Sequence, residues 1–178
     1  MAKLFTDISE DLATFIANQK IFFVGTAASK GRVNISPKGM DTFRVLGPNQ
    51  VVWLNLTGSG NETAAHLLQN NRITIMFCAF EGKPLILRLY GKATIYHERD
   101  EAYHSFITLF PKIMGARQIV EIQVDTVQTS CGYAVPFMEF KEERTMLASW
   151  AEKQGEDRLK AYRKEKNSFS IDNFKTDI

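Results

Sequence analysis

The pattern of hydrophobic and polar residues along the chain predicts a structure made mainly of β-strands. Residues 118–124 alternate apolar and polar side chains at a period of two, as in a half-buried strand. Other stretches are rich in β-branched and aromatic residues and are bounded by glycine- or proline-containing turns, which also indicates strands. They cover residues 21–27, 32–36, 43–46, 50–56, 72–80 and 85–96. The short turn at 81–84 favours antiparallel pairing of the strands that flank it.

Hydrophobic residues at helical spacing predict helices between and after these strands. The predicted helices cover residues 8–20, 64–70, 98–109 and 144–166. Ser9 can cap the start of the first helix, and the last helix is heavily charged. The strand, helix and strand between residues 50 and 80 resemble a parallel crossover, whereas the last dozen residues of the chain are expected to form an extended tail.

These elements together predict the mainly β (α+β) class, with an antiparallel barrel or curved sheet and peripheral helices. No repeat, low-complexity tract or linker divides the chain. We therefore expect one domain over residues 1–178, in which residues 141–178 form a charged, helical C-terminal appendage.

The amino-acid composition argues against several classes of binding partner. Of 178 residues, 44% are hydrophobic and 24% are charged, which is typical of a globular protein, and the formal net charge of +2 is too small to indicate a nucleic-acid partner. Two cysteines and three histidines lack the close spacing of a zinc site. No apolar run approaches the ~20 residues of a membrane helix, and no secretory leader pattern opens the chain. We expect a cytoplasmic protein without a metal or a membrane partner.

The sequence TGSGNET at 57–63 is the strongest candidate for ligand binding. It joins a predicted strand to a predicted helix, so it offers free backbone N–H groups at the positive end of a helix dipole, where a phosphate can bind. Gly60 would allow close approach, and Ser59, Asn61 and Thr63 could donate hydrogen bonds. The alternative is a capping box in which Ser59 and Glu62 satisfy the helix start without a ligand.

A phosphate also needs cations. Lys38 lies between Pro37 and Gly39, and this context predicts a bulge or kink that aims the lysine side chain. Arg72 opens the strand after the helix, and Arg88 lies on the polar side of a long strand. The three histidines are expected to be ordinary surface or boundary residues.

The order of these segments resembles the FMN-binding split β-barrel proteins related to pyridoxamine 5'-phosphate oxidase. The segments are NISPKG at 34–39, TGSGNET at 57–63, NR at 71–72 and LRLYG at 87–91. The resemblance implies a six-stranded antiparallel split β-barrel that forms a homodimer, with one FMN in each of two clefts at the dimer interface.

The resemblance also implies roles for particular residues. The implied cofactor-binding set, in which the last two residues are second choices, is Lys38, Ser59, Gly60, Asn61, Thr63, Arg88, Arg72 and Arg117. Many members of the family carry a Ser-Arg-Lys type sequence at the helix start, where this chain has Asn-Glu-Thr. Neutralisation of the phosphate charge is therefore expected to depend on Lys38 and on Arg72 or Arg88.

The implied function is an FMN-dependent oxidoreductase that passes electrons to or from an unidentified small molecule. The chain lacks the Arg-x-His substrate motif of the true oxidases, so a related branch is expected. Cys131 and Tyr133 could face the flavin ring of a partner subunit, although Cys131 could equally be a buried, inert thiol. A non-catalytic flavin-binding protein for storage or sensing, or a deazaflavin- or haem-binding barrel, is also compatible with the sequence.

Overall fold

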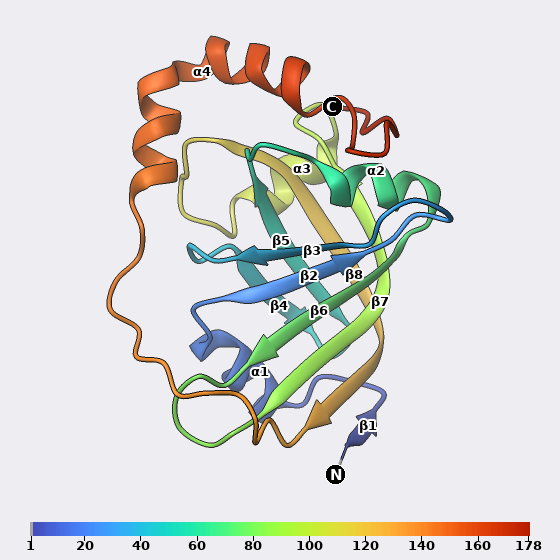
Figure 1. Cartoon of the computed structure of the whole chain (residues 1–178), viewed down its shortest axis with the longest axis vertical. Coiled ribbons are helices and arrows are strands. Elements are labelled where there is room, and N and C mark those ends of the chain that lie inside the picture. Colours follow the sequence, from blue (N-terminus) through green and yellow to red (C-terminus); the bar gives the residue numbers. More distant parts are fainter. Residues whose placement is uncertain (1) are drawn as a thin grey trace.

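The computed structural model describes residues 2–178 and contains one curved, antiparallel sheet with helices around it (Figure 1). The strands are β1 (Lys3–Phe5), β2 (Phe22–Thr26), β3 (Asn34–Lys38), β4 (Phe43–Gly47), β5 (Gln50–Leu56), β6 (Arg72–Cys78), β7 (Ile86–Tyr96) and β8 (Ala116–Ser130). The helices are α1 (Glu10–Asn18), α2 (Glu62–Gln69), α3 (Glu101–Ile107) and α4 (Met146–Lys166). The predicted fold class and its peripheral helices are confirmed.

Seven strands follow the order β3-β2-β6-β7-β8-β5-β4, and β1 pairs with β8 outside this path. The sheet therefore has eight strands, where the family resemblance implies six. Strand β1 gave no sequence signal because its three residues are all exposed and carry no alternating pattern. The expected parallel crossover is wrong, because β7 and β8 separate β5 from β6 in the sheet and every strand pair is antiparallel.

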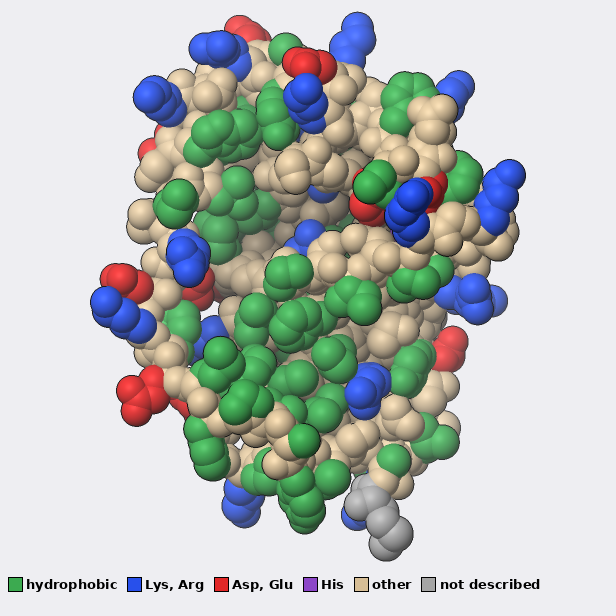
Figure 2. All heavy atoms as spheres, viewed as in Figure 1, with side chains coloured by type: hydrophobic (Ala, Val, Ile, Leu, Met, Phe, Trp, Pro, Cys, Tyr) green, Lys and Arg blue, Asp and Glu red, His purple; other side chains and the backbone are tan. Residues whose placement is uncertain are grey.

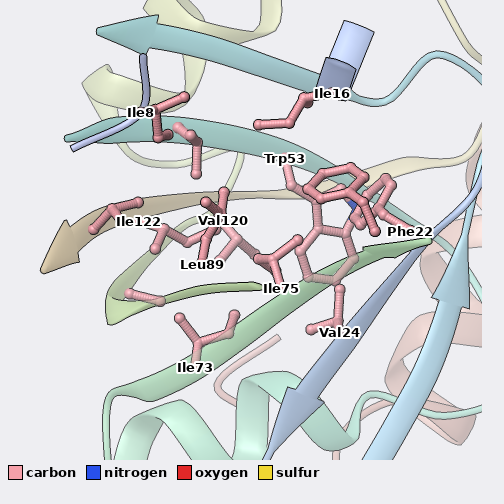
Figure 3. Packing of buried hydrophobic residues seen from close by; sticks show 14 of the residues in the cluster. Ile8, Ile16, Phe22, Val24, Trp53, Ile73, Ile75, Leu89, Val120 and Ile122 are labelled. Atoms are coloured by element: carbon pink, nitrogen blue, oxygen red, sulfur yellow. The ribbon is translucent and has the colours of Figure 1, made fainter. Parts of the chain in front are cut away.

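Burial of both faces of β5 explains the unbroken apolar run at residues 51–54. Val51 and Trp53 point into the main core, whereas Val52 and Leu54 pack in a second cluster with Tyr103 of α3. Both faces of this strand are thus buried, and a strand buried on both faces reads as a continuous hydrophobic run. The main core fills the inside of the curved sheet (Figure 3).

Strand β3 is an edge strand, and this position explains Pro37. The strand pairs with β2 in a regular register through Pro37 and Lys38, so the predicted bulge at Lys38 is wrong. An edge strand tolerates proline because one side of its backbone has no neighbour to bond. The chain turns just after it, where Met40 and Asp41 adopt left-handed backbone angles. Asn34, Ser36 and Lys38 alternate with the exposed residues of β3 and are half-buried.

The C-terminal residues do not form the predicted tail. Helix α4 bends at Gly155, whose φ of 73° and ψ of 168° are not helical, and it arches over one end of the sheet (Figure 1). Beyond the helix, the chain turns back beside α2, and Asn167, Ser170 and Thr176 are buried there. Their polar composition hid this packing, because it rests on hydrogen bonds and not on an apolar stripe: Asn167 bonds to Gly58 and Arg117, whereas Ser170 and Thr176 bond within the C-terminal segment.

Gly91 marks the point where β7 and β8 approach most closely. The register shifts between Tyr90 and Gly91, and a Cβ atom at Gly91 would lie 2.1 Å from the carbonyl oxygen of Gln123. Gly91→Ala should therefore destabilise the protein by about 3 kcal/mol, since backbone would have to move, which lowers Tm by about 6 °C or more. Gly47→Ala is the control in a thermal denaturation, because a Cβ atom at Gly47 would have no neighbour within 4 Å. Equal Tm values for the two variants would contradict this account.

No helix within residues 2–178 has the length and apolar character that crossing a bilayer requires. The same residues contain no group of three or more histidine, cysteine, aspartate or glutamate side chains placed to hold a metal ion.

Candidate phosphate-binding cavity

A polar cavity of about 590 Å³ lies where β3, the 57–61 turn and the start of α2 meet. Figure 2 shows it as a hollow with basic side chains at depth. The residues that line it include Arg32, Asn34, Ser36, Lys38, Asn55, Gly58, Ser59, Gly60, Asn61, Glu62, Thr63, His66, Arg117 and Ile171. Six of the eight predicted cofactor-binding residues therefore surround one cavity: Lys38, Ser59, Gly60, Asn61, Thr63 and Arg117.

The carbonyl groups of the turn are held by side chains from distant parts of the chain. Gly58 O accepts a hydrogen bond from Asn167 Nδ2 at 3.0 Å, and Gly60 O accepts one from Arg117 Nη1 at 2.9 Å. The backbone N–H groups of Ser59, Gly60 and Asn61 donate to no atom in the described part of the chain. These three residues also line the cavity, so their unpaired N–H groups are candidates for binding an anion there.

Asn61 is the N-terminal cap residue of α2, but its side chain makes no capping hydrogen bond. It is only 2% exposed, and both its Oδ1 and its Nδ2 lack a hydrogen-bond partner among residues 2–178. A buried amide without partners costs about 1–3 kcal/mol. Asn61 therefore brings two unpaired amide atoms to the lining of the cavity.

The capping box between Ser59 and Glu62 does not form. The Glu62 carboxylate accepts the N–H of Ile171 at 3.0 Å instead, so it is bound to the C-terminal segment. The neutral N–H of Ile171 orients this carboxylate, but the negative charge stays on the cavity lining, where it opposes the positive charges of Lys38 and Arg117. The sequence could not reveal this contact, since 109 residues separate Glu62 from Ile171.

Lys38 reaches from β3 across the face of a core aromatic residue. Its ammonium nitrogen lies 5.1 Å from the centroid of the Trp53 ring, within the range of a cation–π interaction. Burial lowers the pKa of Lys38 from 10.5 to about 8, and the positive charge of Arg117 contributes to the same shift. Within residues 2–178 no carboxylate forms an ion pair with this ammonium group.

Arg117 is the second cation of the cavity and is only 5% exposed. Burial lowers its pKa to about 9, and the neighbouring charge of Arg163 adds to this effect. Its Nη1 atom donates to the neutral oxygens of Gly60 and Asn167, while its Nε atom has no partner among the described residues. Neither Arg117 nor Lys38 forms an ion pair with a carboxylate in residues 2–178.

Neutral polar groups complete the lining. Ser36 Oγ donates to Asn34 Oδ1, and Asn34 Nδ2 donates to Thr63 Oγ1, so β3 and α2 are linked across the cavity. His66 is 1% exposed, its Nδ1 lies 3.1 Å from Thr26 Oγ1, and its Nε2 has no partner among residues 2–178. The expectation that His66 is an ordinary boundary residue is therefore wrong.

The other predicted residues lie elsewhere. Arg72 is exposed at the start of β6 and donates to Asn70 Oδ1 at 3.2 Å. Arg88 lies on the outward face of β7 and donates to Ser130 Oγ at 3.3 Å. Cys131 and Tyr133 are exposed beyond the end of β8 that is opposite Arg117. The alternative of a buried Cys131 is thus wrong.

An apolar groove of about 960 Å³ adjoins the polar cavity, and Lys38 lines both. Its apolar lining consists of Ile21, Phe23, Pro37, Met40, Phe80, Met138, Phe140, Met146 and Leu147. Charged side chains, among them Lys20, Glu81, Glu142 and Arg144, line the rest of the groove, so the two hollows together offer a polar end and a partly apolar end.

Sequence reasoning missed several residues of the cavity. Arg32, Asn34 and Ser36 belong to the β2–β3 hairpin, and the period-two alternation from Lys38 could have identified Asn34 and Ser36. Ile171, which lines the cavity, and Asn167, which holds the lining residue Gly58, carried no usable signal, because their positions depend on contacts between residues 109 positions apart.

The family model and the related sequence that match this chain belong to the same family. The family model described as pyridoxamine 5'-phosphate oxidase matches residues 8–131. The pyridoxamine 5'-phosphate oxidase family protein ustO of Aspergillus flavus is 35% identical over 144 residues, which cover 78% of this chain but only 58% of that protein.

Two solved structures share the fold. HupZ of Group A Streptococcus is 25% identical, with a TM-score of 0.57 over 67% of this chain and 91% of that chain. A putative pyridoxamine 5'-phosphate oxidase of Lactobacillus delbrueckii is 16% identical, with a TM-score of 0.56 over 69% of this chain and 94% of that chain.

Proposed function

This chain belongs to the pyridoxamine 5'-phosphate oxidase family, and we propose that it binds FMN with the phosphate in the polar cavity. The observation that carries the proposal is the set of buried polar groups without partners. Asn61, His66 and Arg117 all present unpaired atoms at one cavity, together with the free N–H groups of the turn. The oxygens of a phosphate dianion only accept hydrogen bonds, so a bound phosphate would satisfy Asn61 Nδ2, Arg117 Nε and the N–H groups of the turn, but not Asn61 Oδ1, and it would pair with both cations.

The adjoining groove supports a flavin over a simple phosphate. A flat isoalloxazine ring needs an apolar surface next to the phosphate site, and the groove begins at Lys38. FMN would supply the electron-transfer chemistry when bound. The chain's own residues would bind and orient it: Lys38 and Arg117 hold the phosphate, and the apolar side chains of the groove exclude water from the ring.

We further propose that the protein is an oxidoreductase that passes electrons through FMN to or from a small molecule. The open groove supports this proposal, because a substrate can approach the ring there. A flavin-binding protein without turnover is the alternative. Reduction of the bound flavin by NADH, NADPH or another donor, followed by reoxidation with a screened acceptor, would distinguish the two.

The cofactor proposal is tested by the colour and mass of the ligand that copurifies with the protein. FMN would give absorbance near ~450 nm and the mass of FMN in the supernatant of the heat-denatured protein. FAD, a deazaflavin or a haem would each give another mass and spectrum and would overturn the choice of FMN. If no ligand copurifies, titration with added FMN decides, and absence of saturable binding would reject the proposal.

We also propose a homodimer, in which Cys131 and Tyr133 of one subunit approach the flavin of the other. Exposed apolar residues support the proposal of a second subunit. Val33 and Ile35 are each 70% exposed, and Tyr133 is 82% exposed. Figure 2 shows hydrophobic side chains gathered over β2, β6 and β7 on the same side. A contiguous apolar surface of this kind marks an interaction site.

Ile35→Glu should therefore convert the dimer to a monomer, because it places a charge in the buried centre of the proposed interface. Light scattering coupled to size-exclusion chromatography measures the mass of each species. Leu109→Glu is the matched control, since Leu109 is exposed next to α3, away from β3. A monomeric wild-type protein, or an Ile35→Glu protein that stays dimeric, would contradict the proposed interface.

A further inference from the structure

Asn167 connects the cavity to a part of the chain that the family model does not include. The match ends at residue 131, whereas Asn167 follows the last turn of α4. Its side chain is fully buried and bridges two groups of the cavity: Oδ1 accepts from Arg117 Nη1 at 2.7 Å, and Nδ2 donates to Gly58 O at 3.0 Å. One amide thus fixes both the buried cation and the turn.

The surrounding backbone holds Asn167 in place. Its N–H donates to Arg163 O at 2.8 Å, and its own carbonyl accepts from the hydroxyl of Thr176. Arg163 in turn donates to Thr57 Oγ1 at 2.9 Å and to Ala116 O at 2.8 Å. The end of α4 is therefore attached to both strands that lead into the cavity, and Asn167 has little freedom to move.

This arrangement has a consequence for the electrostatics of the cavity. The acceptors of Arg117 are neutral, so they position the guanidinium without cancelling its charge. Lys38 likewise has no carboxylate partner among residues 2–178. Three cations and one carboxylate, Glu62, line the cavity, and Arg32 pairs with Asp172. Lys38 and Arg117 are the lining cations that have no carboxylate partner among residues 2–178, and their two charges match the charge of about −2 on a phosphomonoester better than the single charge of a diester.

We propose that Asn167 is a positioning residue that sets Arg117 and the 57–61 turn for a terminal phosphomonoester group. The proposal rests on the proposed function insofar as FMN is the phosphomonoester. It adds that residues outside the family-matched region make the site selective for the phosphate end of the ligand. The amide is suited to this role because it accepts and donates at once and is uncharged.

The test replaces Asn167 by an isosteric but charged residue. Asn167→Asp keeps an acceptor for Arg117, removes the donor to Gly58 O and places a negative charge beside the guanidinium. FMN affinity should fall by about tenfold or more, whereas the affinity for riboflavin, which lacks the phosphate, should change by less than about twofold. Fluorescence titration of both flavins measures the ratio.

The matched control is Asn173→Asp. Asn173 is exposed in the same C-terminal segment and has a left-handed φ of 62°, which aspartate tolerates. This variant adds the same charge without touching the cavity, so its FMN and riboflavin affinities should match the wild type. If Asn167→Asp weakens the binding of FMN and riboflavin equally, or the binding of neither, Asn167 has only a structural role and the proposal is wrong.

Thermal denaturation with inorganic phosphate tests the role of Asn167 independently of whether FMN is the cofactor. A ligand that binds the folded state raises Tm, so phosphate should raise the Tm of the wild-type protein more than that of Asn167→Asp. If phosphate does so while FMN does not bind, the proposed cofactor is wrong but the phosphomonoester site stands. An equal effect of phosphate on both proteins overturns the role of Asn167.

Discussion

Arg117→Met should weaken FMN binding by about hundredfold and leave riboflavin binding nearly unchanged. A hydrogen bond to a charged group contributes about 1.5–3 kcal/mol, and about 1.4 kcal/mol corresponds to a tenfold change in affinity. Arg117 is expected near the upper end of this range, because it is buried and has no competing carboxylate among residues 2–178. Methionine keeps much of the volume of the side chain while removing the charge.

Arg72→Met is the control for this measurement. Arg72 was equally a candidate from the sequence, but it is exposed at the start of β6 and contacts Asn70. Its replacement should leave the affinities of both flavins unchanged. If Arg117→Met binds FMN as tightly as the wild type does, Arg117 does not bind the phosphate, and the proposed orientation of the cofactor is wrong.

FMN binding should also weaken as the pH rises from 7 to 9. The pKa of Lys38 is lowered to about 8 in the free protein by burial and by Arg117, so the lysine is mostly charged at pH 7 and mostly neutral at pH 9. A phosphate dianion favours the charged form and raises this pKa on binding. Binding above pH 8 therefore requires uptake of a proton, and affinity should fall by up to about tenfold per pH unit.

Titrations at pH 7, 8 and 9 measure this dependence. The second pKa of a phosphomonoester is about 6, so the ligand itself remains a dianion over the range. Lys38→Met should bind FMN about tenfold more weakly at pH 7 and should show a much flatter profile. A wild-type affinity that is constant over these pH values would exclude Lys38 from the phosphate site.

The sequence predicted the features that depend on local pattern. Alternation identified the long strands, the apolar run of β5 predicted a strand, and Ser9 caps α1, as expected, by accepting the N–H of Leu12. The 57–63 turn was recognised because glycines between a strand and a helix mark a place of close backbone approach. These signals need only neighbouring residues.

Features that depend on distant contacts were missed. The alternative in which Glu62 caps its own helix is wrong, because Glu62 binds the backbone of Ile171. His66 carried no sign that its ring would be buried against Thr26. Arg72 and Arg88 could not be separated from Arg117 by sequence, because all three lie in strands and only the sheet order shows which one reaches the cavity.

The bridge that Asn167 forms has a consequence for the order of folding. The hydrogen bonds from Asn167 to Gly58 and from Ile171 to Glu62 each close a loop of 109 residues. Closing such loops costs more chain entropy than forming a hairpin such as β6–β7, so contacts of this span are expected to form late. The sheet should therefore be assembled before the 57–61 turn acquires its final shape, and refolding protein should regain secondary structure earlier than ligand affinity.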